Sequence, residues 1–362
     1  MSRWGKREGM IVHQTEPYNA EPPPDALADR AVTALDTFYS RNHGPIPQLD
    51  PHTWRLRVDG EVDHALSLSL AELQSRFEPR VLTATLQCAG NRRAGLMEVR
   101  DIPGEAPWGS GAISTAEWTG VRLADVLAAA GLGAAAEHVA FAAPDISTLA
   151  EPSQPYGASI PVTKALAGEV LLAWGMNGEP LPAAHGAPVR VVVPGYIGAR
   201  SVKWVQRVSA QRHPSNNYFQ ATAYRLHAAD SDPATAGPYD GLSLGVVAVN
   251  ADILRPVEGQ TLPVGATEVT GYAFAGDRGV ARVDVSLDSG RSWVQADLDE
   301  PSGPWAWRLW RTTLEVPAGP TVITARAWDT AAACQPESAR LLWNPKGYVN
   351  NSWARVRVVG SD

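Results

Sequence analysis

The loss of helical periodicity beyond about residue 230 constrains the fold of this chain most. Before that point the 362-residue sequence mixes helix and strand patterns, whereas beyond it only short alternating runs remain. Over residues 283–287, Val and Leu alternate with Asp and Ser, and residues 322–328 form a further strand-like run. Short strands separated by regularly spaced turns are typical of an all-β sandwich. We therefore expect an α+β domain over residues 1–235 and an all-β domain over residues 236–362, divided at the linker-like run 232–238.

The first part predicts short regular elements set in long loops. Residues 54–60 alternate like a strand, and Ser69 with Glu72 forms a capping-box signal for a short helix. A second helix should end at Gly131, which follows an apolar helical face. The proline-rich residues 1–50 should be irregular. Two further runs read as buried strands, namely residues 171–174 and 189–193.

Composition bounds the partners and the compartment. The net charge of −7 argues against nucleic acid as a partner. No secretory signal and no apolar run long enough to span a membrane are visible, so we expect a cytoplasmic protein that does not contact a membrane. The two cysteines, Cys88 and Cys334, should fall in different domains, which makes a structural disulfide unexpected and fits a reducing compartment.

Cys88 stands in the run Thr-Leu-Gln-Cys-Ala-Gly-Asn-Arg-Arg over residues 85–93. The adjacent arginines should lower the thiol pKa, which suits a metal ligand or a nucleophile. A lone cysteine is more often a small buried hydrophobe, and a nucleophile would need a histidine base such as His43 or His185. Because no hydrolase motif accompanies this cysteine, metal ligation is the favoured interpretation.

The same run resembles the molybdenum-ligating segment of the sulfite oxidase family. Residues 39–47, Tyr-Ser-Arg-Asn-His-Gly-Pro-Ile-Pro, are similar to the family's second hallmark. Further similar segments follow in the family's order over nearly the whole chain: residues 156–161, 185–186, 188–195, 198–200, 202–204 and 350–353. The resemblance implies a sulfite-oxidase-type α+β molybdopterin domain, an immunoglobulin-like dimerisation domain, and therefore a homodimer.

The resemblance also implies a cofactor, a molybdenum-oxo centre chelated by a single pyranopterin (molybdopterin), with Cys88 as the protein's metal ligand. Soft sulfur donors suit such a site, and arginine and lysine suit the pterin phosphate. Taken singly, Arg190 could instead be a strand-end surface charge and His185 a hydrogen-bonded loop residue. Too few residues precede the first motif to form a haem domain, so we expect no haem. The family's other cofactor-binding positions fall on Tyr39, Ser40, Arg41, Asn42, His43, Asp145, His185, Arg190, Ser201, Val202 and Lys203.

The candidate substrate residues are also implied by the family pattern. Arg41 and Arg93 match its anion-pocket arginines, Tyr224 its tyrosine beside the metal, and Trp108 a pocket wall. Tyr224 could instead be a linker residue near the domain boundary. Lys346 stands where sulfite-oxidising members often carry arginine; lysine keeps the charge but loses the bidentate fork. This choice favours sulfite over nitrate and implies that the second domain contributes to the active site.

The implied reaction is oxidation of sulfite to sulfate by oxygen-atom transfer, with electrons passing to an external acceptor such as dioxygen or a cytochrome. One alternative is a related molybdenum enzyme acting on nitrate or an S-oxide. Another is a cofactor-free binding protein built on the same two domains. Retention of Cys88, Arg41 and the phosphate-site cations argues against the cofactor-free protein.

Overall fold

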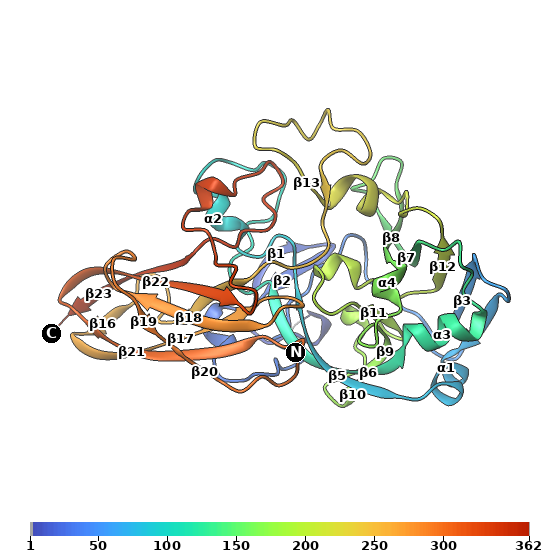
Figure 1. The fold of residues 1–362 in the computed structure, drawn as a ribbon, viewed down its shortest axis with the longest axis horizontal. Helices are drawn as coiled ribbons and strands as arrows, with labels where there is room; N and C mark the ends of the chain where they lie inside the picture. The colour runs from blue at the N-terminus through green and yellow to red at the C-terminus, as the bar shows by residue number, and fades with distance from the viewer. Residues whose placement is uncertain (1–2, 362) are drawn as a thin grey trace.

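The computed structural model describes residues 3–361, which form an α+β part and an elongated β-sandwich that ends at the C-terminus (Figure 1). The α+β part contains two five-stranded sheets, ordered β10-β9-β6-β5, with β11 also paired to β9, and β4-β3-β12-β7-β8. All pairs in them are antiparallel except β3 with β12. Their strands are β3 (Arg55–Gly60), β4 (Leu66–Ser69), β5 (Arg80–Gln87), β6 (Ile113–Arg122), β7 (His138–Ser147), β8 (Gln154–Pro161), β9 (Leu171–Met176), β10 (Glu179–Pro180), β11 (Arg190–Val192) and β12 (Arg207–Gln211).

Short helices connect these strands: α1 (Leu70–Arg76), α2 (Arg93–Met97), α3 (Leu123–Ala130) and α4 (Val162–Ala165). At the start of α1, the Ser69 side chain accepts from the Glu72 amide while the Glu72 carboxylate accepts from Ser69, which is the expected capping box. Helix α3 buries one apolar face and ends at Gly131, whose φ of 68° is the left-handed conformation that glycine adopts at low cost. The sequence predictions for these two helices are therefore confirmed.

The second part is a sandwich of two mainly antiparallel sheets, which confirms the predicted all-β domain. Strand β23 shows why the sequence folds this way, because Ala354, Val356 and Val358 are buried while the residues between them are exposed. One sheet has the order β15-β17-β21-β20 and the other β16-β23-β22-β18-β19. Their strands are β15 (Asn250–Arg255), β16 (Thr261–Pro263), β17 (Gly265–Phe274), β18 (Val280–Ser286), β19 (Val294–Gln295), β20 (Asp297–Leu298), β21 (Arg308–Val316), β22 (Gly319–Asp329) and β23 (Ala354–Ser361).

The N-terminal segment departs from the expectation of irregular structure. It contains a hairpin of β1 (Ile11–Thr15) and β2 (Tyr18–Glu21), and all four residues of β2 are buried. The backbone of Ala20 continues the pairing by exchanging hydrogen bonds with Ser40. The many prolines of this segment led to the expectation of irregular structure. Pro17 lies in the turn of the hairpin, however, and the two strands contain no proline.

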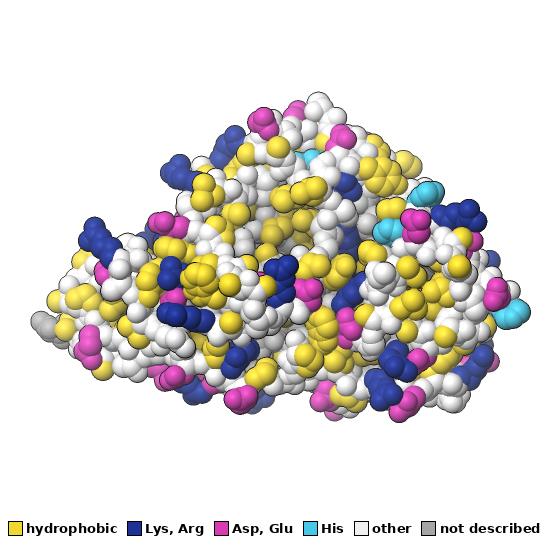
Figure 2. All heavy atoms as spheres, viewed as in Figure 1, with side chains coloured by type: hydrophobic (Ala, Val, Ile, Leu, Met, Phe, Trp, Pro, Cys, Tyr) yellow, Lys and Arg dark blue, Asp and Glu magenta, His cyan; other side chains and the backbone are white. Residues whose placement is uncertain are grey.

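Between the two parts, β13 (Arg225–Leu226) pairs with β14 (Leu242–Ser243), and the segment between them is largely exposed. The boundary expected at residue 235 lies within this segment. The two parts nevertheless share apolar packing, because Tyr272, Phe274 and Trp307 belong to the main core of the first part. Within residues 3–361, no helix is long and apolar enough to cross a membrane. Figure 2 shows positive and negative side chains interspersed over the displayed face.

A buried ion pair joins the two parts. Arg92 Nε lies 3.0 Å from Asp252 Oδ2, and the Arg92 guanidinium also donates to the backbone oxygens of Ser352 and Trp353. Both side chains are about nine-tenths buried, so removing one charge leaves the other without its partner in a low-dielectric environment.

We expect Arg92→Met to lower the free energy of unfolding by about 3 kcal/mol, because it strands the Asp252 carboxylate. The matched control is Arg255→Met, which breaks the exposed Arg255–Asp29 pair and should cost less than about 1 kcal/mol. Urea denaturation of both variants measures the difference. Equal losses would show that the buried pair contributes no more than a surface pair.

Candidate active site

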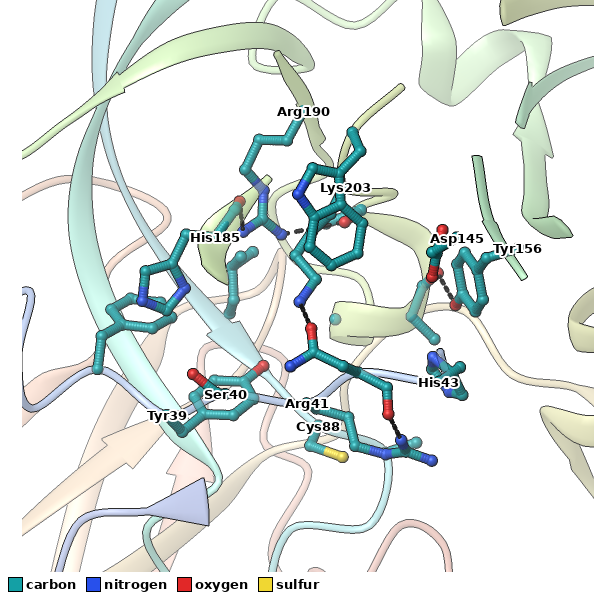
Figure 3. Close-up of a pocket in the computed structure, with 18 of the residues that line it drawn as sticks. Tyr39, Ser40, Arg41, His43, Cys88, Asp145, Tyr156, His185, Arg190 and Lys203 are labelled. Atoms are coloured by element: carbon teal, nitrogen blue, oxygen red, sulfur yellow. Dashed lines mark hydrogen bonds between the residues drawn. The ribbon is translucent and has the colours of Figure 1, made fainter. Parts of the chain in front are cut away.

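A cavity of about 640 Å³, counting space open to solvent at its mouth, lies in the α+β part. Its wall brings together segments far apart in the sequence, including the loop after residue 38, the end of β5, β7 and the loops around β11. Figure 3 shows Arg190 and Lys203 across this cavity from Cys88 and Arg41. Eleven of the twelve predicted cofactor-binding residues line it: Tyr39, Ser40, Arg41, Asn42, His43, Cys88, Asp145, His185, Arg190, Ser201 and Lys203.

Val202 is the exception among the predicted positions. Its side chain is 1% exposed, belongs to the hydrophobic core and does not line the cavity. Its carbonyl instead accepts a hydrogen bond from Val191, which aligns the segment of Ser201 and Lys203 beside β11. Val202 stands between two residues that line the cavity, Ser201 and Lys203, and its own side chain packs in the core.

The cationic end of the cavity is rigidly held. The Arg190 guanidinium donates to the carbonyls of His185 and Ser201, each at 3.0 Å. The guanidinium carbon Cζ lies 4.9 Å from the Trp118 ring centroid. Arg190 is 4% exposed, so it is not a strand-end surface charge. Lys203 donates to the Asn42 side chain and, at 3.1 Å, to the Ala184 carbonyl. Burial lowers the pKa of Arg190 to about 10, and burial together with Arg190 lowers the pKa of Lys203.

His185 borders this cationic end and is only 3% exposed. Its Nε2 lies 2.7 Å from the Nζ of Lys6, which also donates to the carbonyls of Leu35 and Phe38. Burial, followed by the charges of Lys6 and Lys203, lowers the pKa of His185 well below its usual range. His185 is therefore neutral, and when its Nε2 accepts from Lys6 its Nδ1 carries the proton.

Cys88 follows β5 directly, and its sulfur accepts a hydrogen bond from the Gly90 amide at 3.4 Å. Burial raises the pKa of the thiol, and the opposing charges of Arg41 and Arg93 do not outweigh it. The expected net lowering of this pKa was therefore wrong for the protein chain by itself, although Arg93 acts in the expected direction. Arg92, one of the two adjacent arginines, is instead directed to Asp252. Both Cys88 and Cys334 are free thiols.

Two buried polar atoms of the cavity wall, Ser40 Oγ and Asp145 Oδ1, have no hydrogen-bond partner among residues 3–361. Buried polar atoms are almost always paired, so these two are available to hydrogen-bond a polar ligand or an ordered water. Burial, opposed by Lys203, raises the pKa of Asp145 to about 7. Within the same part of the chain, no cluster of three or more His, Cys, Asp or Glu could hold a metal ion. Cys88 supplies one soft sulfur donor to this cavity.

A second cavity, of about 930 Å³ counting open space, adjoins the first and shares Arg41, His43 and Tyr224 with it. All five of the substrate-pocket residues expected besides Cys88 line this cavity: Arg41, Arg93, Trp108, Tyr224 and Lys346. Lys346 comes from the loop before β23, so the second part of the chain does contribute to this cavity. The arrangement places three cations around a space that opens beside the cysteine cavity.

Tyr224 is 4% exposed, and its hydroxyl lies 2.6 Å from His43 Nε2. It is therefore a pocket residue and not a linker tyrosine. The His43 ring also stacks on Tyr156 at 4.6 Å between centroids. Burial, together with Arg41 and Lys203, lowers the pKa of His43, while burial raises that of Tyr224, so both groups are neutral.

Trp108 is positioned by hydrogen bonds around the Glu21 carboxylate and by a ring contact with His13, both from the N-terminal hairpin. Glu21 accepts hydrogen bonds from the amides of Gly109 and Gly111, and His13 Nε2 lies 2.7 Å from its carboxylate. The His13 ring meets the Trp108 ring edge-on at 4.6 Å between centroids. The hairpin that sequence reasoning missed therefore positions one wall of the second cavity.

Several lining residues were not assigned a role from the sequence. Glu105 and Tyr348 line the second cavity, and no motif marked Glu105. The remaining residues of the first cavity lie beside or within segments that already showed a family resemblance, so a full alignment of those segments could have found them. They are Phe38, Leu86, Ala89, Tyr156, Gly198, Ala199 and Trp204.

Sulfur at one end of the cavity, cations at the other and two unpartnered polar atoms in its wall fit a molybdopterin-binding enzyme. Residues 43–219 match the family model described as "Oxidoreductase molybdopterin binding domain". Residues 243–360 match the family model described as "Mo-co oxidoreductase dimerisation domain". Sulfite oxidase from Gallus gallus is 44% identical over 97% of this chain, which spans 78% of that protein. The chain belongs to the sulfite oxidase family of molybdenum oxidoreductases.

Two further comparisons show the breadth of the family. A nitrate reductase from Hordeum vulgare is 38% identical over 98% of this chain, but the chain spans only 42% of that protein. The crystal structure of the sulfane dehydrogenase SoxCD from Paracoccus pantotrophus has a TM-score of 0.83, with 26% identity over 98% of this chain and 87% of that one. The α+β domain with an appended sandwich is therefore the family's fold.

Proposed function

We propose that this protein oxidises sulfite to sulfate, with electrons passing to an external acceptor such as dioxygen or a cytochrome. The observation that carries the proposal is the ring of Arg41, Arg93 and Lys346 around a cavity that adjoins the buried Cys88 cavity. Sulfite is a small dianion, and several fixed cations in a partly buried pocket bind such an ion strongly.

The cofactor-binding residues would hold a single-pyranopterin molybdenum group, with Cys88 as the metal ligand and Arg190 and Lys203 at the phosphate end. The group supplies two-electron oxygen-atom-transfer chemistry when bound. The chain's own contribution is to fix that group and to place the anion beside it. Trp108, which is buried, forms part of one wall of the anion cavity.

Tyr224 and His43 would manage the proton near the reacting centre. Since His43 is neutral, it can donate from Nε2 to the Tyr224 oxygen, which leaves the tyrosine hydroxyl free to donate into the anion cavity. The raised pKa of Tyr224 keeps that hydroxyl protonated. Arg41 would stabilise negative charge at the boundary between the two cavities, because it lines both.

Lys346→Met tests the assignment of sulfite against nitrate. Lysine provides one of three pocket charges, so its loss should reduce kcat/KM for sulfite by about 10- to 100-fold, mainly through KM. The measurement is sulfite-dependent reduction of a one-electron acceptor, with nitrate reduction assayed in parallel on reduced enzyme. An unchanged kcat/KM for sulfite in Lys346→Met would contradict the place of Lys346 in a sulfite pocket. Nitrate turnover that exceeds sulfite turnover in the unmodified protein would favour the nitrate-reducing branch.

The remaining parts of the proposal concern assembly. We propose a catalytic domain over residues 1–235 and an immunoglobulin-like dimerisation domain over residues 236–362, with two copies forming a homodimer. The match of residues 243–360 to a dimerisation domain supports the dimer. The absence of haem and a cytoplasmic location stay predictions.

A further inference from the structure

One carboxylate stands inside the proposed anion pocket. Glu105, in the loop between α2 and β6, has a side chain that is 20% exposed. Its Oε2 lies 3.3 Å from an Arg93 terminal nitrogen, and its Oε1 lies 3.2 Å from Lys346 Nζ. It therefore bridges two of the three cations assigned to substrate, one from each part of the chain.

Among the described residues, Glu105 is the one acid that lines this cavity. Its charge reaches the other pocket groups, because it adds to burial, the larger cause, in raising the pKa of both Tyr224 and Tyr348. An acid at this place opposes the binding of any anion, since it removes about one unit of positive charge from the space that the anion would enter.

Glu105 is not needed to hold Arg93 in place. The Arg93 Nε donates to the carbonyls of Lys346 and Gly347, and one terminal nitrogen donates to the Ala106 carbonyl at 2.9 Å. The Arg93 guanidinium also lies over the Tyr348 ring, at 5.2 Å from its centroid. Backbone and ring contacts thus position this arginine, and the carboxylate takes a donor that is otherwise available to a ligand.

We propose that Glu105 is an internal competitor of the substrate: its two oxygens take the place of an oxyanion between Arg93 and Lys346, and thereby set how tightly the pocket holds an anion. The inference rests on the proposed function of this pocket as a sulfite site. An anion that enters must displace the carboxylate from one or both cations. The consequence is weaker anion binding and faster release of a product dianion.

The test uses sulfate as a non-oxidisable dianion and the molybdenum-loaded protein. Isothermal titration calorimetry in a chloride-free buffer of low ionic strength compares Glu105→Gln with the unmodified protein. We expect the sulfate Kd to fall by about tenfold or more, and the KM for sulfite to fall with it. Glu105→Ala should act in the same direction, which guards against an effect particular to glutamine.

The matched control is Glu61→Gln, which changes the net charge equally but breaks an exposed pair with Arg212 outside both cavities. It should leave sulfate affinity within about twofold. Sulfate binding by both Glu105 variants that is equal to or weaker than that of the unmodified protein would overturn the proposal. Glu105 would then serve to hold the two cations in place. Absence of sulfate binding in every form would instead overturn the sulfite-site function on which the proposal rests.

Discussion

Replacing Cys88 by serine should reduce sulfite turnover by more than about 100-fold, because a hard hydroxyl replaces the soft sulfur that suits the metal. Even residues outside the direct ligands of a metal commonly cost 10- to 100-fold when changed. Serine is nearly isosteric and can retain the hydrogen bond from the Gly90 amide, so the fold should persist. The measurement is steady-state sulfite oxidation with an artificial acceptor, together with the molybdenum content of the purified protein.

Cys334→Ser is the matched control for this change. Cys334 is the second free cysteine and lies beside β22, away from both cavities, so its replacement should leave turnover unchanged. Normal turnover in Cys88→Ser would contradict the assignment of Cys88 as the metal ligand. An equal loss in both variants would show that the effect is not specific to Cys88.

Replacing Arg41 by methionine should lower kcat/KM for sulfite by about 100-fold or more. Arg41 lines both cavities, so its charge serves both the anion and the adjoining cofactor site. Removing one partner of a desolvated charged pair typically costs 2–5 kcal/mol, and about 1.4 kcal/mol corresponds to a factor of ten. Methionine approximates the arginine stem, so the change chiefly removes the charged head.

Arg212→Met serves as the control, because Arg212 belongs to an exposed pair with Glu61 and lines neither cavity. Initial rates over a range of sulfite concentrations separate the effect on KM from that on kcat. A change of less than about threefold in Arg41→Met would contradict its proposed place in the anion pocket, since a cation in contact with a dianion should contribute more than that.

The fold was predictable where local pattern and burial agree. The capping box at Ser69 and the alternating residues of β23 depend on periodicities that a sequence displays directly. The hairpin of β1 and β2 was missed, because its burial depends on contacts with Ser40 and with the loop of Gly109 and Gly111. Such contacts come from tertiary structure and leave no local signal.

The site was predictable where a motif carried it and not where a single residue reached in from a loop. Cys88, Arg190 and Lys203 stand in ordered segments and do line one cavity. Glu105 stands in no motif, and its ion pair with Lys346 joins residues 241 positions apart. The pKa of Cys88 was misjudged because burial, which a sequence does not display locally, raises it more than Arg41 and Arg93 lower it; Arg92 is turned to Asp252.

The central claim is that sulfite reduces a molybdenum centre ligated by Cys88. The most direct measurement is to add sulfite anaerobically to the molybdenum-loaded protein and follow the cysteine-sulfur-to-molybdenum charge-transfer absorption, which requires no knowledge of the electron acceptor. The account predicts rapid bleaching of this absorption by sulfite in the unmodified protein, and no such band in Cys88→Ser. An unchanged spectrum in protein of confirmed molybdenum content would contradict sulfite as the substrate.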